Sequence, residues 1–238
     1  TAEYRFYAMK IGFAGINLPE GSHKYEDPIL GKLAELAKPA KVTSYFFTFL
    51  QDNFSGVQAA TVSRESIWDI LIGDLEKIEN RLARAEDEQH RSFFDACRKH
   101  LESEQPLCDM ELEPEQRAEL KAMDTASFNP TVVLDKPPES WDTVCPLLME
   151  KAGRMFFYTS GPREVRSWFV PVRATAIECA AQIHSDLARG FIKAEIIPFE
   201  KFQECHSFKD AAQKGLTKLV DRDEPVPPET VLEIRFNV

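Results

Sequence analysis

The fold of this chain is decided by the stretch Met155-Phe-Phe-Tyr-Thr159, Ser160-Gly-Pro162 and Glu164-Val-Arg-Ser-Trp-Phe-Val170. Two apolar runs rich in aromatic and β-branched residues, separated by a short turn with glycine and proline, predict a β-hairpin. Val165 and residues 168–170 supply its buried side. We therefore expect a small domain that begins with this hairpin.

The residues after the hairpin complete the plan of a small domain. Thr175 is suited to cap a helix, because apolar residues follow it at spacings of three and four. Later apolar runs predict further strands over Phe191–Ile197, Leu216–Val220 and Val231–Val238. The order β-β-α-β-(α)-β-β, with a helix on one face of a mixed sheet, is the ubiquitin-like β-grasp plan.

Four segments of this domain resemble the C-terminal TGS domain of the YchF family, which are Obg-related P-loop NTPases. They are Phe157-Tyr-Thr-Ser-Gly-Pro-Arg-Glu-Val-Arg-Ser-Trp168, Ala180-Ala-Gln-Ile-His-Ser-Asp186, Gly190-Phe-Ile-Lys-Ala-Glu195 and Ile234-Arg-Phe-Asn-Val238. The resemblance implies a binding module without chemistry of its own, in a protein that associates with ribosomes. We expect residues 151–238 to form this TGS-like β-grasp domain and to fold independently.

The N-terminal part predicts a small α/β sheet. Three elements form a parallel crossover unit. They are an extended run over Tyr4–Gly15, a helix that is capped by Asp27 and ends at Lys38, and an apolar run over Val42–Leu50. The last run alternates too little for a one-sided strand, so we expect it to be buried on both faces. With a short strand at Thr131–Leu134, the sheet would have about three parallel strands.

A helical arm interrupts this sheet. From Glu65 to about Ser103, apolar residues alternate by four and three, which is typical of a coiled coil; they are Ile67, Leu71, Leu75, Ile78, Leu82 and Ala85. Pro106 interrupts the pattern, and Glu113-Pro114 begins a return helix. The arm resembles the one inserted in YchF. We place a helical hairpin at about residues 64–125 and favour an intramolecular pair of helices over a partner-binding tip.

The resemblance gives a division into two domains. Residues 1–150 would be a reduced and degenerate P-loop-type α/β domain carrying the helical hairpin, and residues 151–238 the β-grasp domain. Family sequences begin near Met9, so Thr1–Ala8 is either a native extension or an added segment.

The family's phosphate-binding loop is altered. A loop of the form G-x-x-x-x-G-K-[ST] cradles phosphates with backbone amides, while its lysine neutralises them and its hydroxyl binds magnesium. Here Gly15 and Gly21 are one residue too far apart, Ser22 stands in place of the lysine, and Glu20 adds negative charge. Lys24 could substitute only if the loop refolds.

The other nucleotide motifs are also incomplete. The segment Asp52-Asn-Phe-Ser-Gly56 is one residue longer than D-x-x-G, and Glu139 keeps the acid of N-x-x-E without its asparagine. A remnant nucleotide site would comprise Gly15, Gly21, Ser22, Lys24, Asp52 and Glu139. We expect no cofactor; the alternative is ATP or GTP with magnesium. No side chains lie at catalytic or metal-ligand spacing, so we assign no catalytic residue and no metal site.

Charge and composition limit the partners. The net charge is −10, and residues 151–238 carry 13 Lys and Arg against 12 Asp and Glu, so the first 150 residues are strongly acidic. Free binding to DNA is therefore not expected. The five cysteines are odd in number and lack C-x-x-C spacing, and no apolar run could span a membrane, which together favour the cytoplasm.

These observations favour a non-hydrolysing adaptor that is associated with translation and binds the ribosome, RNA or a protein. Its contact would use Arg163, Arg166 and Lys193, on the sheet face that the β-grasp helix leaves free. The alternative is a divergent ATPase or GTPase with a rebuilt phosphate loop. A third hypothesis, a small-ligand sensor, has support only by analogy with TGS domains elsewhere. The partner and the oligomeric state stay open.

Overall fold

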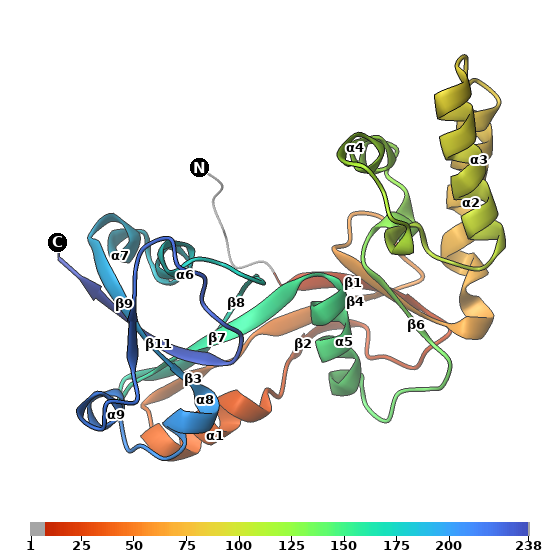
Figure 1. The fold of residues 1–238 in the computed structure, drawn as a ribbon. Helices are drawn as coiled ribbons and strands as arrows, with labels where there is room; N and C mark the ends of the chain where they lie inside the picture. Colours follow the sequence, from red (N-terminus) through yellow and green to blue (C-terminus); the bar gives the residue numbers. More distant parts are fainter. Residues whose placement is uncertain (1–7, 238) are drawn as a thin grey trace. The chain divides into compact units, whose positions relative to one another are not determined.

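The computed structural model describes residues 8–237, which form two compact units (Figure 1). The β-grasp unit consists of residues 24–46 and 153–237, and the α/β unit consists of residues 8–23 and 47–152. The sequence placed all of residues 1–150 in one domain. The structure differs, because the segment 24–46 groups with the C-terminal residues.

The β-grasp unit contains a six-stranded sheet with the order β10-β9-β11-β7-β8-β3. The central strands β11 and β7 are parallel, whereas β7 pairs with β8, and β9 with β11 and β10, in antiparallel fashion. The strands are β3 (Lys41–Thr43), β7 (Arg154–Ser160), β8 (Glu164–Pro171), β9 (Phe191–Pro198), β10 (Lys218–Val220) and β11 (Thr230–Phe236). The helices are α1 (Pro28–Ala37), α6 (Ala176–Ile183), α7 (Ser185–Arg189), α8 (Phe199–Phe202) and α9 (Phe208–Gln213).

Helix α6 covers one face of this sheet, as the sequence predicted. Thr175 caps it in a capping box, and its backbone N–H donates to Glu178 Oε2 at 2.8 Å. Cys179 and Ala176 of the helix share one buried cluster with Phe157 and Trp168 of the hairpin. The predicted β-grasp fold is therefore confirmed.

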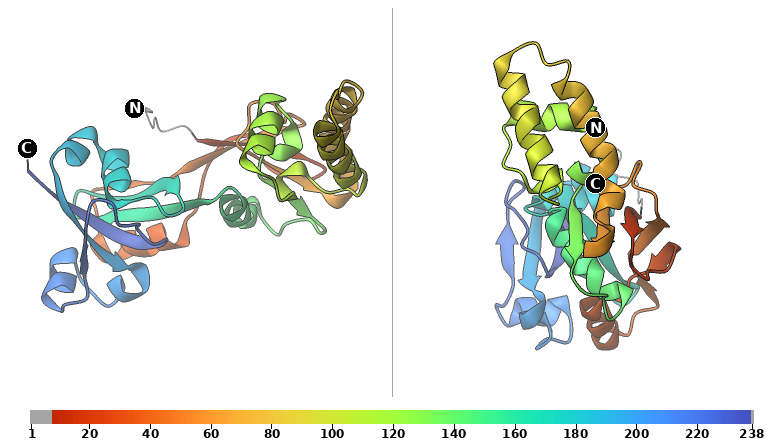
Figure 2. Two further views of the ribbon diagram at one scale, coloured as in Figure 1. Left: turned by 45° about the horizontal axis from the view of Figure 1, so that its top comes forward. Right: turned by 90° about the vertical axis from the view of Figure 1, so that its right-hand side faces the viewer.

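The opposite face of the hairpin is covered, although the sequence left it free. Helix α1 packs against β7 and β8, and Figures 1 and 2 show it on the other side of the sheet from α6. Tyr25 stacks on Phe156, and Tyr158 Oη donates to Asp27 Oδ2 at 2.8 Å. The prediction of a free face beside the hairpin was wrong, because residues 24–46 bury its second row of aromatic side chains.

The run Val42–Leu50 divides between two sheets. β3 joins β8, whereas β4 (Phe46–Gln51) pairs with β1 (Met9–Ala14) of the other sheet. Along β4, Phe47 and Phe49 are buried but Phe46 is 45% exposed. The expectation of burial on both faces was wrong, since the helix that precedes β4 packs against β7 and β8 instead.

The α/β unit contains a five-stranded sheet with the order β2-β4-β1-β5-β6. The pairs β1–β4, β1–β5 and β5–β6 are parallel. The remaining strands are β2 (Gly21–Lys24), β5 (Ala59–Ser63) and β6 (Thr131–Leu134). The predicted strand at 131–134 is present, and the first predicted strand is described from residue 8 onward, since Tyr4–Tyr7 lie outside the described residues. The sequence missed β5, whose short run lies directly before the helical pattern.

The helical arm turns earlier than predicted. Helices α2 (Trp68–Leu82) and α3 (Glu88–Glu102) pack against each other, so the hairpin turn lies at residues 83–87 rather than at Pro106. Asp87 begins α3 by accepting a hydrogen bond from the His90 N–H at 2.8 Å. The turn contains no glycine or proline, which explains why the sequence pattern did not reveal it. The remaining helical elements are α4 (Pro114–Ala122), α5 (Val144–Lys151), η1 (Arg64–Ser66), η2 (Leu107–Asp109), η3 (Ala126–Phe128) and η4 (Trp141–Thr143).

A buried carboxylate anchors the arm to the chain that returns from it. Asp74 of α2 is 1% exposed, and it accepts hydrogen bonds from the N–H groups of Ala126 and Ser127 and from the Ser127 hydroxyl at 2.6 to 2.8 Å. Burial raises the pKa of this carboxyl, while the hydrogen bonds from Ser127 act against that rise. The three donors therefore depend on Asp74 for their partner.

Candidate functional site

The segment after β1 does not form a phosphate-binding loop. Gly15 has a φ of 66°, and a Cβ there would lie 2.3 Å from the hydroxyl oxygens of Ser63 and Ser66. Leu18 turns inward and is only 6% exposed. Gly21 and Ser22 then lie in strand β2 and not at the start of a helix. The glycine at position 15 thus permits close packing.

The helix that follows cannot take the place of the missing loop. A phosphate binds at a helix N-terminus because free N–H groups point at it. In α1 the N–H groups of Ile29 and Leu30 donate to Asp27 Oδ1 at 2.9 and 3.3 Å, so a carboxylate already occupies that end. Lys24 Nζ lies 3.1 Å from Glu26 Oε1, and both residues belong to the β-grasp unit.

The other predicted nucleotide residues are only partly brought together. Asp52 follows β4 and Gly15 follows β1, so both lie at the carboxyl edge of two neighbouring parallel strands. The Asp52 N–H donates to Phe13 O at 2.9 Å. Glu139 is exposed in the segment between β6 and η4. Of the six predicted residues, the carboxyl edge therefore gathers Gly15 and Asp52, while Lys24 groups with the other unit.

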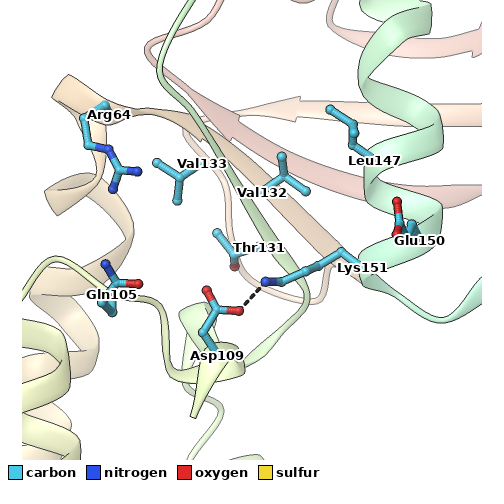
Figure 3. Close-up of a pocket in the computed structure, with 9 residues that line it drawn as sticks. All are labelled: Arg64, Gln105, Asp109, Thr131, Val132, Val133, Leu147, Glu150 and Lys151. Atoms are coloured by element: carbon cyan, nitrogen blue, oxygen red, sulfur yellow. Dashed lines mark hydrogen bonds and ion pairs between the residues drawn. The ribbon is translucent and has the colours of Figure 1, made fainter.

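A pocket of about 600 Å³ lies beside β6, at the edge of the α/β sheet (Figure 3). Figure 3 shows the Lys151 side chain reaching Asp109, with which it forms an ion pair. Arg64 Nε lies 3.0 Å from Asp135 Oδ1. The residues drawn include no histidine or cysteine, so they supply neither an imidazole base nor a thiol nucleophile. The two cations of the pocket, Arg64 and Lys151, are already paired with acids. The pocket therefore gives no support for a particular reaction.

The three predicted contact residues do not form one surface. Arg166 lies on the same sheet face as Trp168, beside α6, with its guanidinium carbon 4.0 Å from the Trp168 ring centroid. Lys193 precedes the buried Ala194 and therefore points to the opposite face, where it forms an ion pair with Asp221. Strands β11 and β7 separate β9 from β8. The sequence grouped these residues wrongly because it did not fix strand order or facing.

Two lysines, Lys38 and Lys41, lie beside the hairpin, which the sequence did not predict. The register of β3 and β8 pairs Lys41 with Glu164, and the Ala40 N–H donates to Pro162 O at 3.0 Å. This bond places Lys38 and Lys41 next to the hairpin turn that carries Arg163. The short β-branched run after Pro39 could have indicated a separate strand at this place. The prediction instead merged that run with the strand that follows it.

The residues from 8 to 237 contain no group of three or more histidine, cysteine or acidic side chains that could hold a metal ion. No helix within this part of the chain is long and apolar enough to cross a membrane.

Comparison with known proteins supports the assignment of the C-terminal domain. Residues 155–237 match the family model YchF-GTPase_C, described as a protein of unknown function (DUF933). Ribosome-binding ATPase YchF of Haemophilus influenzae is 42% identical over 82 residues, which cover 34% of this chain and 23% of that protein. The Bacillus subtilis protein of the same name is 36% identical over 86 residues, which cover 36% of this chain and 24% of the relative. The matched region is thus less than a quarter of each relative.

A solved structure matches over nearly the whole chain. The Schizosaccharomyces pombe YchF GTPase superposes with a TM-score of 0.73 and 12% identity, covering 95% of this chain and 97% of the solved one. At this identity the likeness concerns the fold alone. The fold thus defines an α/β protein with a helical arm and a β-grasp unit. The predicted resemblance to the YchF family is confirmed, and residues 155–237 match the model of that family's C-terminal domain.

Proposed function

We propose that this chain is a cytoplasmic binding protein of the translation apparatus, which associates with ribosomes and does not hydrolyse a nucleotide. The α/β unit would be a reduced, degenerate P-loop domain that serves as a scaffold, and the β-grasp unit would make the contact. The names of its YchF relatives support the ribosome as partner.

The course of the chain after β1 carries the non-hydrolysing part of the proposal. In place of a loop that leads into a helix, residues 15–20 lead into β2, which hydrogen-bonds to β4. Lys24 is paired with Glu26, and Asp27 blocks the N-terminus of α1. A triphosphate would therefore lack both the amide cradle and the lysine that neutralise its charge.

Calorimetry with ATP and with GTP, each in magnesium, tests the absence of a nucleotide site. We expect no binding tighter than about 1 mM, which corresponds to roughly −4 kcal/mol. The neighbouring positions of Gly15 and Asp52 favour the alternative, a divergent NTPase. Micromolar binding that is lost in Asp52→Ala would establish that alternative and refute our proposal.

Co-sedimentation with purified ribosomes tests the partner. The unmodified protein should sediment with ribosomes at low salt and be released as the salt concentration rises, because charged contacts are screened. A protein that stays in the supernatant at low salt would refute the association with ribosomes. Addition of ATP or GTP should leave the sedimenting fraction unchanged.

A further inference from the structure

A groove of about 480 Å³ lies on the helical arm, between α3 and the residues 110–116 that lead into α4. We call it the arm groove. It shares no residue with the pocket beside β6 or with the predicted nucleotide residues. One wall is a single face of α3 that includes Gln89, Phe93 and Ala96, since residues three or four apart lie on the same side of a helix. All residues that line the groove belong to the α/β unit.

The floor of the arm groove is apolar and well packed. Phe93 is 8% exposed and belongs to the buried core cluster of the arm, and Met110 and Leu112 pack against the same cluster. On the side of α4, Gln116 Oε1 accepts a hydrogen bond from the Glu113 N–H at 3.0 Å. These contacts hold both sides of the groove in place, so a partner would meet a surface that is already formed.

The rim of the arm groove is acidic. Glu88 lies in the first turn of α3 and Glu111 follows Met110; both are exposed, and within residues 8–237 neither forms an ion pair. The described residues that line the groove include no lysine or arginine. Residues 86–119 together hold eleven acidic side chains against four basic ones. The groove therefore lies in a region of negative potential.

An apolar floor with an acidic rim selects among possible occupants. RNA does not fit, because its phosphates would face Glu88 and Glu111 with no cation of the groove between them. A second copy of this chain carries a net charge of −10 and would be repelled. A positively charged protein segment with apolar side chains matches both the floor and the rim.

The length of the arm groove indicates how much of such a segment it can hold. From Glu88 to Ala96, α3 rises by about 12 Å at about 1.5 Å per residue, which is about two helical turns. A helix that lies along a groove presents apolar side chains about once per turn, at positions i and i+4. About two such side chains would therefore reach the floor.

We propose that the arm groove binds a basic amphipathic helix of a partner protein. Two apolar side chains of that helix pack on Phe93, Met110 and Leu112, and its lysine or arginine side chains lie beside Glu88 and Glu111. The inference does not rest on the proposed association with ribosomes. It adds a contact with a protein to the α/β unit.

The probe for this site is a fluorescent peptide of about 14 leucine and lysine residues, with the leucines three and four apart so that they form one face of a helix. The control peptide has the same composition in an order that gives no apolar face. Fluorescence anisotropy with the full chain at about 0.15 M salt measures binding. The amphipathic peptide should bind at least about tenfold more tightly than the control. Equal affinities would mean that charge alone attracts the peptides and would overturn the proposal.

The variant Glu111→Lys tests the rim. Residue 111 lies outside the helices and strands, and the added cation should weaken binding of the amphipathic peptide by about tenfold through repulsion. The matched control is Glu76→Lys, an exposed position of α2 that does not line the groove, where the affinity should stay within about twofold of the wild type. Equal losses in the two variants would show a general charge effect and contradict a specific site.

The variant Ala96→Gln tests the groove without a change of charge. Ala96 is exposed, and glutamine is a good helix former whose longer side chain narrows the groove, so binding should weaken by about fivefold. The matched control is Ala118→Gln, on an exposed position of α4 outside the groove, which should bind like the wild type. The melting temperatures of all four variants should stay close to that of the wild type. Equal binding by Ala96→Gln and Ala118→Gln would mean that no side chain enters the groove, and the proposal would fail.

Discussion

The α/β unit and the β-grasp unit differ in the evidence that supports them: the first has a mainly parallel sheet, and the second matches a family model over most of its length. In the α/β unit, four strands pair in parallel, and Ile11, Phe13, Phe47 and Phe49 are buried, while the segment after β1 leads into strand β2 and not into a helix. In the β-grasp unit, the matched family residues extend over nearly all strands and helices. A sheet depends on many apolar contacts, whereas a phosphate site depends on a few loop residues, so a parallel sheet of this kind can form without a phosphate-binding loop.

The largest expected effect concerns residues 24–46, which complete the β-grasp unit. A fragment of residues 151–238 should lack cooperative unfolding, because it exposes side chains such as Phe156, Tyr158 and Val165. Each costs roughly 1.5 to 3 kcal/mol when uncovered, and a whole domain is stable by only about 5 to 15 kcal/mol. Urea unfolding followed by near-UV circular dichroism measures this.

The control for the fragment joins residues 24–46 to 153–238 through a flexible linker. This fusion should regain a cooperative transition. The sequence alone predicted that residues 151–238 fold independently, so a cooperative transition in the fragment without residues 24–46 would favour that simpler division of the chain.

The second effect tests the anchor of the helical arm. Asp74→Ala should destabilise the protein by about 2 to 4 kcal/mol, because the N–H groups of Ala126 and Ser127 and the Ser127 hydroxyl lose their acceptor. The matched control is Glu76→Ala on the exposed side of the same helix, which should stay within about 0.5 kcal/mol of the wild type. Similar urea midpoints for the two variants would show that the arm does not rely on this anchor.

The third effect separates packing from ligand binding at Gly15. Gly15→Ala should cost about 2 kcal/mol, because of its positive φ and the close approach of Ser63 and Ser66. Gly21 also has a positive φ, but a Cβ added there would meet no atom closer than 3.9 Å. Gly21→Ala should therefore cost about 1 kcal/mol or less. Equal thermal stability of both variants would contradict a packing role for Gly15.

The smallest effect concerns Asp27, whose pKa burial raises above its usual value near 3.8, against the hydrogen bond from Tyr158. The folded state then binds the proton more tightly than the unfolded state, so stability falls as pH rises through this range. Tyr158→Phe removes a donor to the carboxylate and raises the pKa of Asp27 further. It should cost about 1 kcal/mol at pH 7 and less well below pH 3.8, where Asp27 is protonated in both the folded and the unfolded state.

The matched background for this variant is Asp27→Asn. The amide that replaces the carboxyl group does not titrate, so Tyr158→Phe should then change the urea midpoint equally at both pH values. A pH dependence that persists in this background would assign the effect to another group.

Local patterns in the sequence determined much of the fold. The turn at Gly161-Pro162 and the capping residues Asp27 and Thr175 specify their elements through contacts within a few residues, and the structure confirms each of them. The spacing between Gly15 and Gly21, which is one residue longer than in a phosphate loop, was also visible in the sequence, because such a loop has a fixed length.

Only the tertiary structure decided which sheet each strand joins and which face each side chain covers. By periodicity alone, the helix and the strand of the segment 24–46 would suit either unit. The segment joins the β-grasp unit because its aromatic rings stack on Phe156 and Phe169, which lie more than a hundred residues away in the sequence. Strand order likewise separated Lys193 from Arg166 and brought Lys38 and Lys41 to the hairpin turn. Such pairings are set by long-range packing, which leaves no local pattern in the sequence.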